Sequence, residues 1–143
     1  MDVSDLRKRI LRALEDARKD ASSRRTVVDE AAKAFETFLT GMAVPLMRQA
    51  VNVLRAEGHL FTIQTPAGSV RIVADRTPDS FLEIALDPAT DPPQAVGRIS
   101  VARGRQGMVV DERPIAEGKA IAELTEEDVS VYLVAELVKL VVR

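Results

Sequence analysis

The fold of this chain is decided by residues 26–57, which read TVVDEAAKAFETFLTGMAVPLMRQAVNVLRAE. Apolar residues recur in this stretch at steps of three and four, the spacing that lines one face of a helix. The residues of this apolar face are Val28, Ala31, Phe35, Phe38, Leu39, Met42, Leu46, Ala50, Val53 and Leu54. Thr26 and Asp29 form an N-cap pattern at one end, and Gly58 is a typical helix stop at the other. The sequence therefore predicts a long helix between these limits.

This helix is too long for a compact domain of this size to enclose. Unbroken, it would be about 48 Å long, whereas the radius of gyration of such a domain is about 15 Å. Pro45 offers a break, because it lacks a backbone donor and its ring crowds the carbonyl of Gly41. We therefore expect the helix to bend at Pro45, to project from the domain, or to contact a partner.

The residues before this stretch predict a first helix. Asp2 or Ser4 can cap it, and it extends to about Ala21. Its apolar residues form a narrow stripe at coiled-coil spacing: Val3, Leu6, Ile10, Ala13, Leu14, Ala17 and Ala21. Residues 22–25, SSRR, interrupt the pattern. They favour a turn or kink between two N-terminal helices, with a continuous helix as the alternative.

A period of two replaces the helical period after Gly58. Apolar and polar residues alternate along five segments: 59–65, 69–75, 80–86, 95–102 and 108–113. Pro and Gly mark the turns between them, and residues 87–94, DPATDPPQ, carry three prolines that exclude a regular strand. The pattern predicts an antiparallel meander of about five strands. Its solvent face is predicted to carry Thr62, Gln64, Arg71, Glu83, Arg98 and Ser100.

The C-terminal residues predict one further helix. Thr125 precedes three acidic residues, which is an N-cap followed by a first turn that favours negative charge. The abundance of valine would also suit a strand. Residues 114–124 are ambiguous, because 116–124 fit a strand or a loop and residues 120–123 could also begin this helix. The polar residues of the helix fall on one narrow strip: Asp128, Tyr132, Glu136, Lys139 and Arg143. Apart from Ser130, the other positions after Asp128 are apolar, so we expect cover on two sides, from the sheet and from a helix or second subunit.

Length and composition indicate one globular α+β domain. The chain has 143 residues, of which 46% are hydrophobic and 29% charged. We divide it into a helical arm at 1–58, an antiparallel sheet at 59–115, and a linker with the C-terminal helix at 116–143. The absence of cysteine excludes disulfides and fits a reducing cytoplasm. No apolar run is long enough to span a membrane, and the charged start does not resemble an export signal. Most basic residues are arginine, which is typical of a GC-rich bacterial genome.

The sequence lacks a catalytic constellation. Its one histidine, His59, follows the Gly58 helix stop, and no serine lies in a nucleophile motif. The segment from Gly104 to Gly107 leads into a strand, so it does not form a phosphate-binding loop. The acidic residues near 87–91 and 123–128 lack the spacing of a calcium loop. We therefore predict no catalytic residue, no cofactor and no metal. A patch of Arg71, Arg98, Arg103 and Arg105 could bind an anion, although a solvated sheet face is the favoured interpretation, because Glu83 and Asp111 lie nearby in the pattern.

Three functions follow from these features. The first is a non-enzymatic, self-associating interaction or assembly module, expected to be a homodimer. Its candidate surface is made of Leu6, Ile10 and Leu14 on the first helix, and of Val131, Val134 and Val138 on the last. The second is a nucleoid-type DNA-binding dimer, against which the net charge of −2 argues. The third is a small-molecule pocket between sheet and helices, predicted to be lined by Phe35, Phe38, Met42, Phe61 and Phe81.

Overall fold

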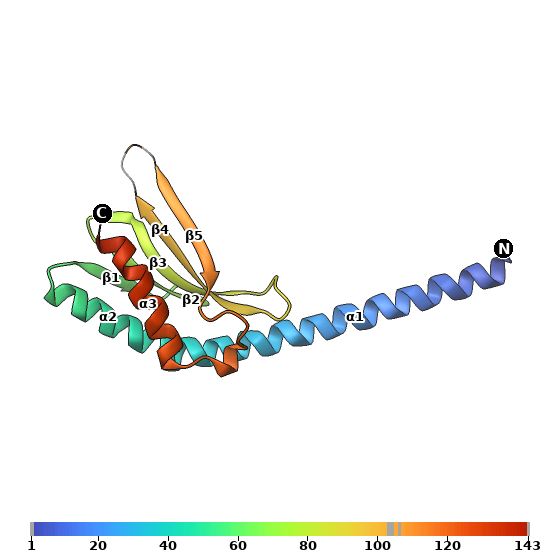
Figure 1. Cartoon of the computed structure of the whole chain (residues 1–143). Helices are drawn as coiled ribbons and strands as arrows, with labels where there is room; N and C mark the ends of the chain where they lie inside the picture. Colours follow the sequence, from blue (N-terminus) through green and yellow to red (C-terminus); the bar gives the residue numbers. More distant parts are fainter. Residues whose placement is uncertain (1, 103–104, 106, 143) are drawn as a thin grey trace.

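The computed structural model describes residues 2–102, 105 and 107–142. Helices come first and last along the chain, and a five-stranded antiparallel sheet lies between them (Figure 1). This is the α+β fold that the sequence predicts. The N-terminal part of the first helix extends away from the sheet as a free arm (Figure 1).

The first helix, α1 (Val3–Phe38), is continuous, so the predicted break at 22–25 is wrong. Its N-cap is Asp2, whose carboxylate accepts from the Ser4 amide, as one of the two predicted caps. Thr26 lies inside the helix instead of capping a second one, and its hydroxyl donates to the Ser22 carbonyl at 3.2 Å. Residues 22–25 are all exposed, and serine and arginine are tolerated on an exposed helix. The polarity of SSRR therefore marked solvent exposure, not a turn.

The predicted irregularity near Pro45 takes the form of a π-helical turn, η1 (Leu39–Ala43). There the Val44 amide donates to the Leu39 carbonyl, five residues earlier. Helix α2 (Val44–Ala56) follows, with Pro45 in its first turn, and it runs in a different direction from α1 (Figure 1). Gly58, at φ +86°, ends it as predicted, and the His59 amide donates to the Leu54 carbonyl.

The π turn shifts the buried face of the helix by one residue. Phe35 and Phe38 enter the core from α1, and the next core residues are Ala43, Met47 and Val51. The step from Phe38 to Ala43 is five residues, which a regular α-helix would place on a different face. The predicted series continued through Met42, Leu46, Ala50 and Leu54, which are half-buried, and Val53, which is exposed. The apolar face was thus predicted correctly up to Leu39. Beyond Leu39, the residues that face the core lie one position further along the chain than predicted.

The sheet is the predicted meander, with strands in the order β1-β2-β3-β4-β5. Its strands are β1 (Phe61–Gln64), β2 (Ser69–Ala74), β3 (Thr77–Asp87), β4 (Gln94–Ala102) and β5 (Met108–Pro114). All neighbouring pairs are antiparallel. The proline-rich residues 88–93 form the loop between β3 and β4, as expected from their missing donors.

The C-terminal element is a helix, α3 (Glu126–Val141), preceded by a 3-10 turn, η3 (Ile121–Glu123). Thr125 and Asp128 form a reciprocal capping box, which confirms the predicted helix start. The Lys119 ammonium and the Thr125 amide hold the pKa of Asp128 below its usual range. Strand β5 ends at Pro114, and residues 115–124 are a turn and a short 3-10 segment rather than a strand.

The core lies between one face of the sheet and the helices. Helix α2 contacts β1 and β2, while α3 contacts β3 and β4. At the centre, the ring of Tyr132 lies directly on Gly97 of β4, where a Cβ atom would overlap the phenol. Glycine is therefore required at position 97 for α3 to approach the sheet this closely.

Candidate interaction surfaces

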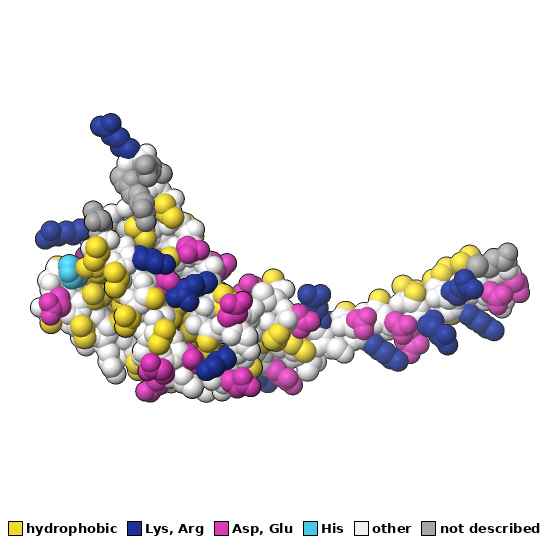
Figure 2. Space-filling view, in the orientation of Figure 1, with side chains coloured by type: hydrophobic (Ala, Val, Ile, Leu, Met, Phe, Trp, Pro, Cys, Tyr) yellow, Lys and Arg dark blue, Asp and Glu magenta, His cyan; other side chains and the backbone are white. Residues whose placement is uncertain are grey.

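The first candidate surface is the free part of α1. Every residue from 2 to 27 is exposed, and Val28 is the first to be half-buried. Leu6, Ile10 and Leu14 are 49%, 50% and 47% exposed. Figure 2 shows apolar side chains along one edge of this arm and charged side chains along the other. We call residues 2–27 the arm. The apolar residues along one edge of it are called the arm stripe, namely Val3, Leu6, Ile10, Ala13, Leu14, Ala17 and Ala21. The arm stripe contains the three residues predicted from the sequence.

The second candidate surface is the outward face of α3. Val131, Val134 and Val138 are 60%, 68% and 54% exposed, and they project away from the sheet. On the opposite face, the apolar core residues are Val129, Leu133 and Leu140. Of the two sides of α3 that were predicted to need cover, the sheet covers one. The other side, Val131, Val134 and Val138, is called the valine face, and no part of the described chain covers it.

The polar strip of α3 lies partly inside the protein, which the sequence does not indicate. Tyr132 is buried, and the Glu136 side chain is only 2% exposed. The Glu136 carboxylate accepts from the Arg113 guanidinium at 2.8 Å and from the Lys139 ammonium at 3.1 Å. Arg113 also stacks on the Tyr132 ring, with its Cζ 4.6 Å from the ring centre. Arg143, the last residue of the predicted strip, is outside the described residues.

The two basic partners keep Glu136 charged. Burial alone would raise the pKa of its carboxyl, but the hydrogen bonds and charges of Arg113 and Lys139 outweigh burial and hold the pKa below its usual range. Burial, followed by the negative charge of Glu136, raises the pKa of Tyr132. This group is therefore a satisfied ion-pair cluster that fixes α3 to β5, and it offers no free acid or base for catalysis.

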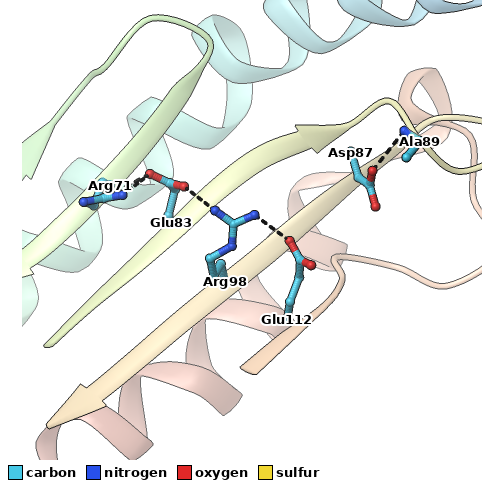
Figure 3. A network of polar contacts seen from close by, with 6 residues as sticks. All are labelled: Arg71, Glu83, Asp87, Ala89, Arg98 and Glu112. Carbon is cyan, nitrogen blue, oxygen red and sulfur yellow. Dashed lines mark hydrogen bonds and ion pairs between the residues drawn. The ribbon is translucent and has the colours of Figure 1, made fainter. Parts of the chain in front are cut away.

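The far face of the sheet carries a row of alternating charges. Arg71, Glu83, Arg98 and Glu112 are direct neighbours on β2, β3, β4 and β5 (Figure 3). Glu83 accepts from Arg71 at 2.8 Å and from Arg98 at 3.4 Å, and Arg98 reaches Glu112 at 2.8 Å. Two of the four arginines of the predicted anion patch, Arg71 and Arg98, are thus paired with carboxylates, which weakens that hypothesis. Arg105 is exposed. Arg103 is outside the described residues.

Two residues that were predicted to lie on the solvent face, Glu83 and Ser100, are buried instead. Glu83 is buried beneath its two arginines, and Ser100 is fully buried, with its hydroxyl donating to the Asp79 carbonyl at 2.8 Å. Arg71 also covers Phe81, with its Cζ 4.1 Å from the ring centre. Long arginine side chains therefore shield the middle of this face without a helix above it.

The predicted small-molecule pocket is not assembled. Phe35, Phe38 and Phe61 are packed in the core, whereas Phe81 lies on the opposite face of the sheet. Phe38 and Met42 do line a shallow apolar groove between α1 and η3, together with Ala34, Ile121 and Leu124. His59 lines a second hollow with Arg76 and Leu140.

The part of the chain that the structure describes lacks two further kinds of feature. No group of three or more metal-ligating side chains occurs among the described residues. In the same part of the chain, no helix combines the length and apolar character needed to cross a membrane.

The comparisons with known proteins identify no relative. No family model, no curated protein and no solved structure matches this chain.

Proposed function

We propose that this protein is a non-enzymatic assembly module that forms a homodimer through its arm. The observation that supports the proposal is the arm itself, a helical extension in which every residue is exposed. Isolated helices are marginally stable in water, because most helical stability in proteins comes from packing of an apolar face. The arm stripe provides such a face and has no partner within the described chain. A second copy of the same stripe would supply one.

The remaining features support binding better than catalysis. The titratable cluster at Glu136 is internally paired, and the charged row on the far face is paired as well. The valine face of α3 is a second apolar surface, separate from the arm stripe in the fold (Figure 1). It suits contact with a further protein once the arms have paired. The cysteine-free composition fits a cytoplasmic location for this assembly.

Sedimentation of purified protein over a wide concentration range tests the proposal. We expect the wild-type chain to sediment as a dimer that dissociates on dilution. Replacing Leu6, Ile10 and Leu14 by Gln should give a monomer with unchanged fold, because these exposed side chains contribute nothing to the core. The matched control is Lys8→Gln with Glu15→Gln, which changes the polar side of the arm without changing net charge and should leave the dimer intact.

Two results would contradict the proposal. A wild-type chain that is monomeric at all concentrations would exclude self-association. A Leu6, Ile10 and Leu14 variant that remains dimeric would exclude the arm, and replacing Val131, Val134 and Val138 by Ser would then show whether α3 forms the contact. A DNA-binding role makes a different prediction, namely strong retention on heparin that weakens steeply with salt.

A further inference from the structure

We infer that two arms pair antiparallel, with the N-terminal end of each arm at the base of the other, an inference that rests on the dimer proposed above. The paired surface is the arm stripe extended to the base of the arm. Its central line consists of Val3, Leu6, Ile10, Leu14, Ala17, Ala21, Arg25 and Val28, and Ala13 of the arm stripe lies beside this line. The two bodies, residues 28–142 of each copy, would then lie at opposite ends of the pair.

The spacing of the residues on this central line is the same whether it is counted from Val3 or from Val28. Its successive steps are three, four, four, three, four, four and three residues. An antiparallel partner centred between Glu15 and Asp16 therefore places every residue of the central line opposite another. The average step is close to the α-helical repeat, so two nearly straight helices stay in contact along the whole stripe.

Side-chain size also favours the antiparallel direction. The large residues Leu6, Ile10 and Leu14 lie in the first half of the stripe, and the small residues Ala17 and Ala21 follow them, before Arg25 and Val28. Antiparallel pairing sets Ile10 opposite Ala21 and Leu14 opposite Ala17, which keeps the separation of the two helices constant. Parallel pairing would set Ile10 on Ile10 and Leu14 on Leu14, followed by alanine on alanine at positions 17 and 21, so the helices could not pack closely throughout.

The charged residues of the arm also favour antiparallel pairing. In a parallel pair, each Arg25 would face the Arg25 of the other copy within the seam, and like charges at close range are unfavourable. In the antiparallel pair, Arg25 lies opposite Leu6, which its aliphatic stem can cover, and Arg7 of the other copy is one residue further along, outside the central line. Arg9 comes within two residues of Asp20 of the other copy, about 3 Å along the axis, so the two side chains can form an ion pair.

The body of the protein limits the overlap to this length. Phe35, two steps beyond Val28 on the same line of the helix, is 3% exposed because the chain's own core covers it. Helix α1 contacts η3 in the same region. A parallel partner would bring its own body to the same place, whereas an antiparallel partner ends there. At the base, Val27 and Val28 face Pro88 and Pro93 of the β3–β4 loop across a hollow that could receive Val3 of the other copy.

Disulfide cross-linking tests the direction, because the natural chain has no cysteine. Chains carrying Ile10→Cys and chains carrying Ala21→Cys are purified separately, oxidised alone, and oxidised after mixing. We expect a cross-linked dimer chiefly in the mixture. The matched control is a mixture of Lys8→Cys and Ser23→Cys chains, which stand at equal heights on the outer faces and should not cross-link.

The possible outcomes separate this inference from the proposed function. Efficient cross-linking within each single variant would show a parallel pair and overturn the direction, while the dimer would stand. A sedimenting dimer without any cross-link would place the contact elsewhere and also overturn it. A monomer without cross-links would overturn both. As a second measurement, spin labels at Glu117→Cys in the two bodies should lie more than about 35 Å apart, given an overlap of about 26 residues at 1.5 Å each; a shorter separation would contradict the antiparallel arrangement.

Discussion

At the scale of single residues, the buried carboxylate of Glu136 is the feature most open to test. Its position in the predicted polar strip indicated a solvent-exposed side chain, because glutamate is seldom fully buried. The sequence holds no local signal for its burial, since Arg113 is 23 residues away and meets it only through the fold. The same applies to Tyr132 and Gly97, whose contact joins α3 to β4.

We expect Glu136→Gln to lower the free energy of unfolding by about 2 kcal/mol at neutral pH, because it removes a buried charge from two basic partners. Glu112→Gln is the matched control on the far face. Its side chain is 43% exposed and pairs with Arg98, so we expect a loss of less than about 1 kcal/mol. Urea denaturation followed by the fluorescence of Tyr132, the only tyrosine in a chain without tryptophan, measures both.

The same carboxyl predicts a pH dependence. Its pKa is lower in the folded protein than in the unfolded chain, so the unfolded chain binds the proton more tightly. Its contribution is complete above the ordinary carboxyl pKa and is lost as the pH falls through the folded value. The stability difference between wild type and Glu136→Gln should therefore shrink in acid. A difference that grows in acid would contradict the lowered pKa.

At the scale of elements, the helix and strand boundaries were predictable where a local signal exists. The Thr125 capping box, the Gly58 stop and the period-two strands all have such signals. The π turn was partly predictable, because Gly41 and Pro45 indicated a break. The residues that face the core after the turn were not predictable, because Met42 and Leu46 continue a regular apolar face as well as Ala43 and Met47 do. Only the sheet beneath the helix decides between the two series.

The π turn yields a prediction about Thr40, an exposed residue within it. Deleting Thr40 shortens the step between the core residues Phe38 and Ala43 from five to four, which a regular helix can accommodate. However, Pro45 would then lie inside a continuous α-helix, at a cost of about 3 kcal/mol. We expect the deletion to be destabilising alone and largely corrected by Pro45→Ala in the same chain, as measured by urea denaturation.

The control for this experiment is Pro45→Ala in the full-length chain. Pro45 is exposed, so we expect its replacement to change the free energy of unfolding by less than about 1 kcal/mol. If the double variant were no more stable than the deletion alone, the π turn would serve the packing of α2 directly instead of relieving the proline.

At the scale of the whole molecule, the structure separates a body that holds the entire core from an arm that holds none of it. The buried hydrophobic residues begin at Phe35, and the described residues before Val28 are all exposed. The sequence therefore correctly indicated more apolar helix surface than the core can bury. Which part of the helix stays exposed depends on where the continuous helix leaves the body. That point is set by η3 and the β3–β4 loop, which lie far along the chain.

This separation predicts that the body folds without the arm. A chain lacking residues 2–27 should unfold cooperatively, with the tyrosine fluorescence of native Tyr132, and should sediment as a monomer. Its unfolding midpoint should not depend on protein concentration, whereas that of the full chain should rise with concentration, because a dimer is stabilised by mass action. A truncated chain that is still dimeric would assign self-association to the valine face of α3. A truncated chain that cannot fold would show that the arm stabilises its own body, and the two-part division would then be wrong.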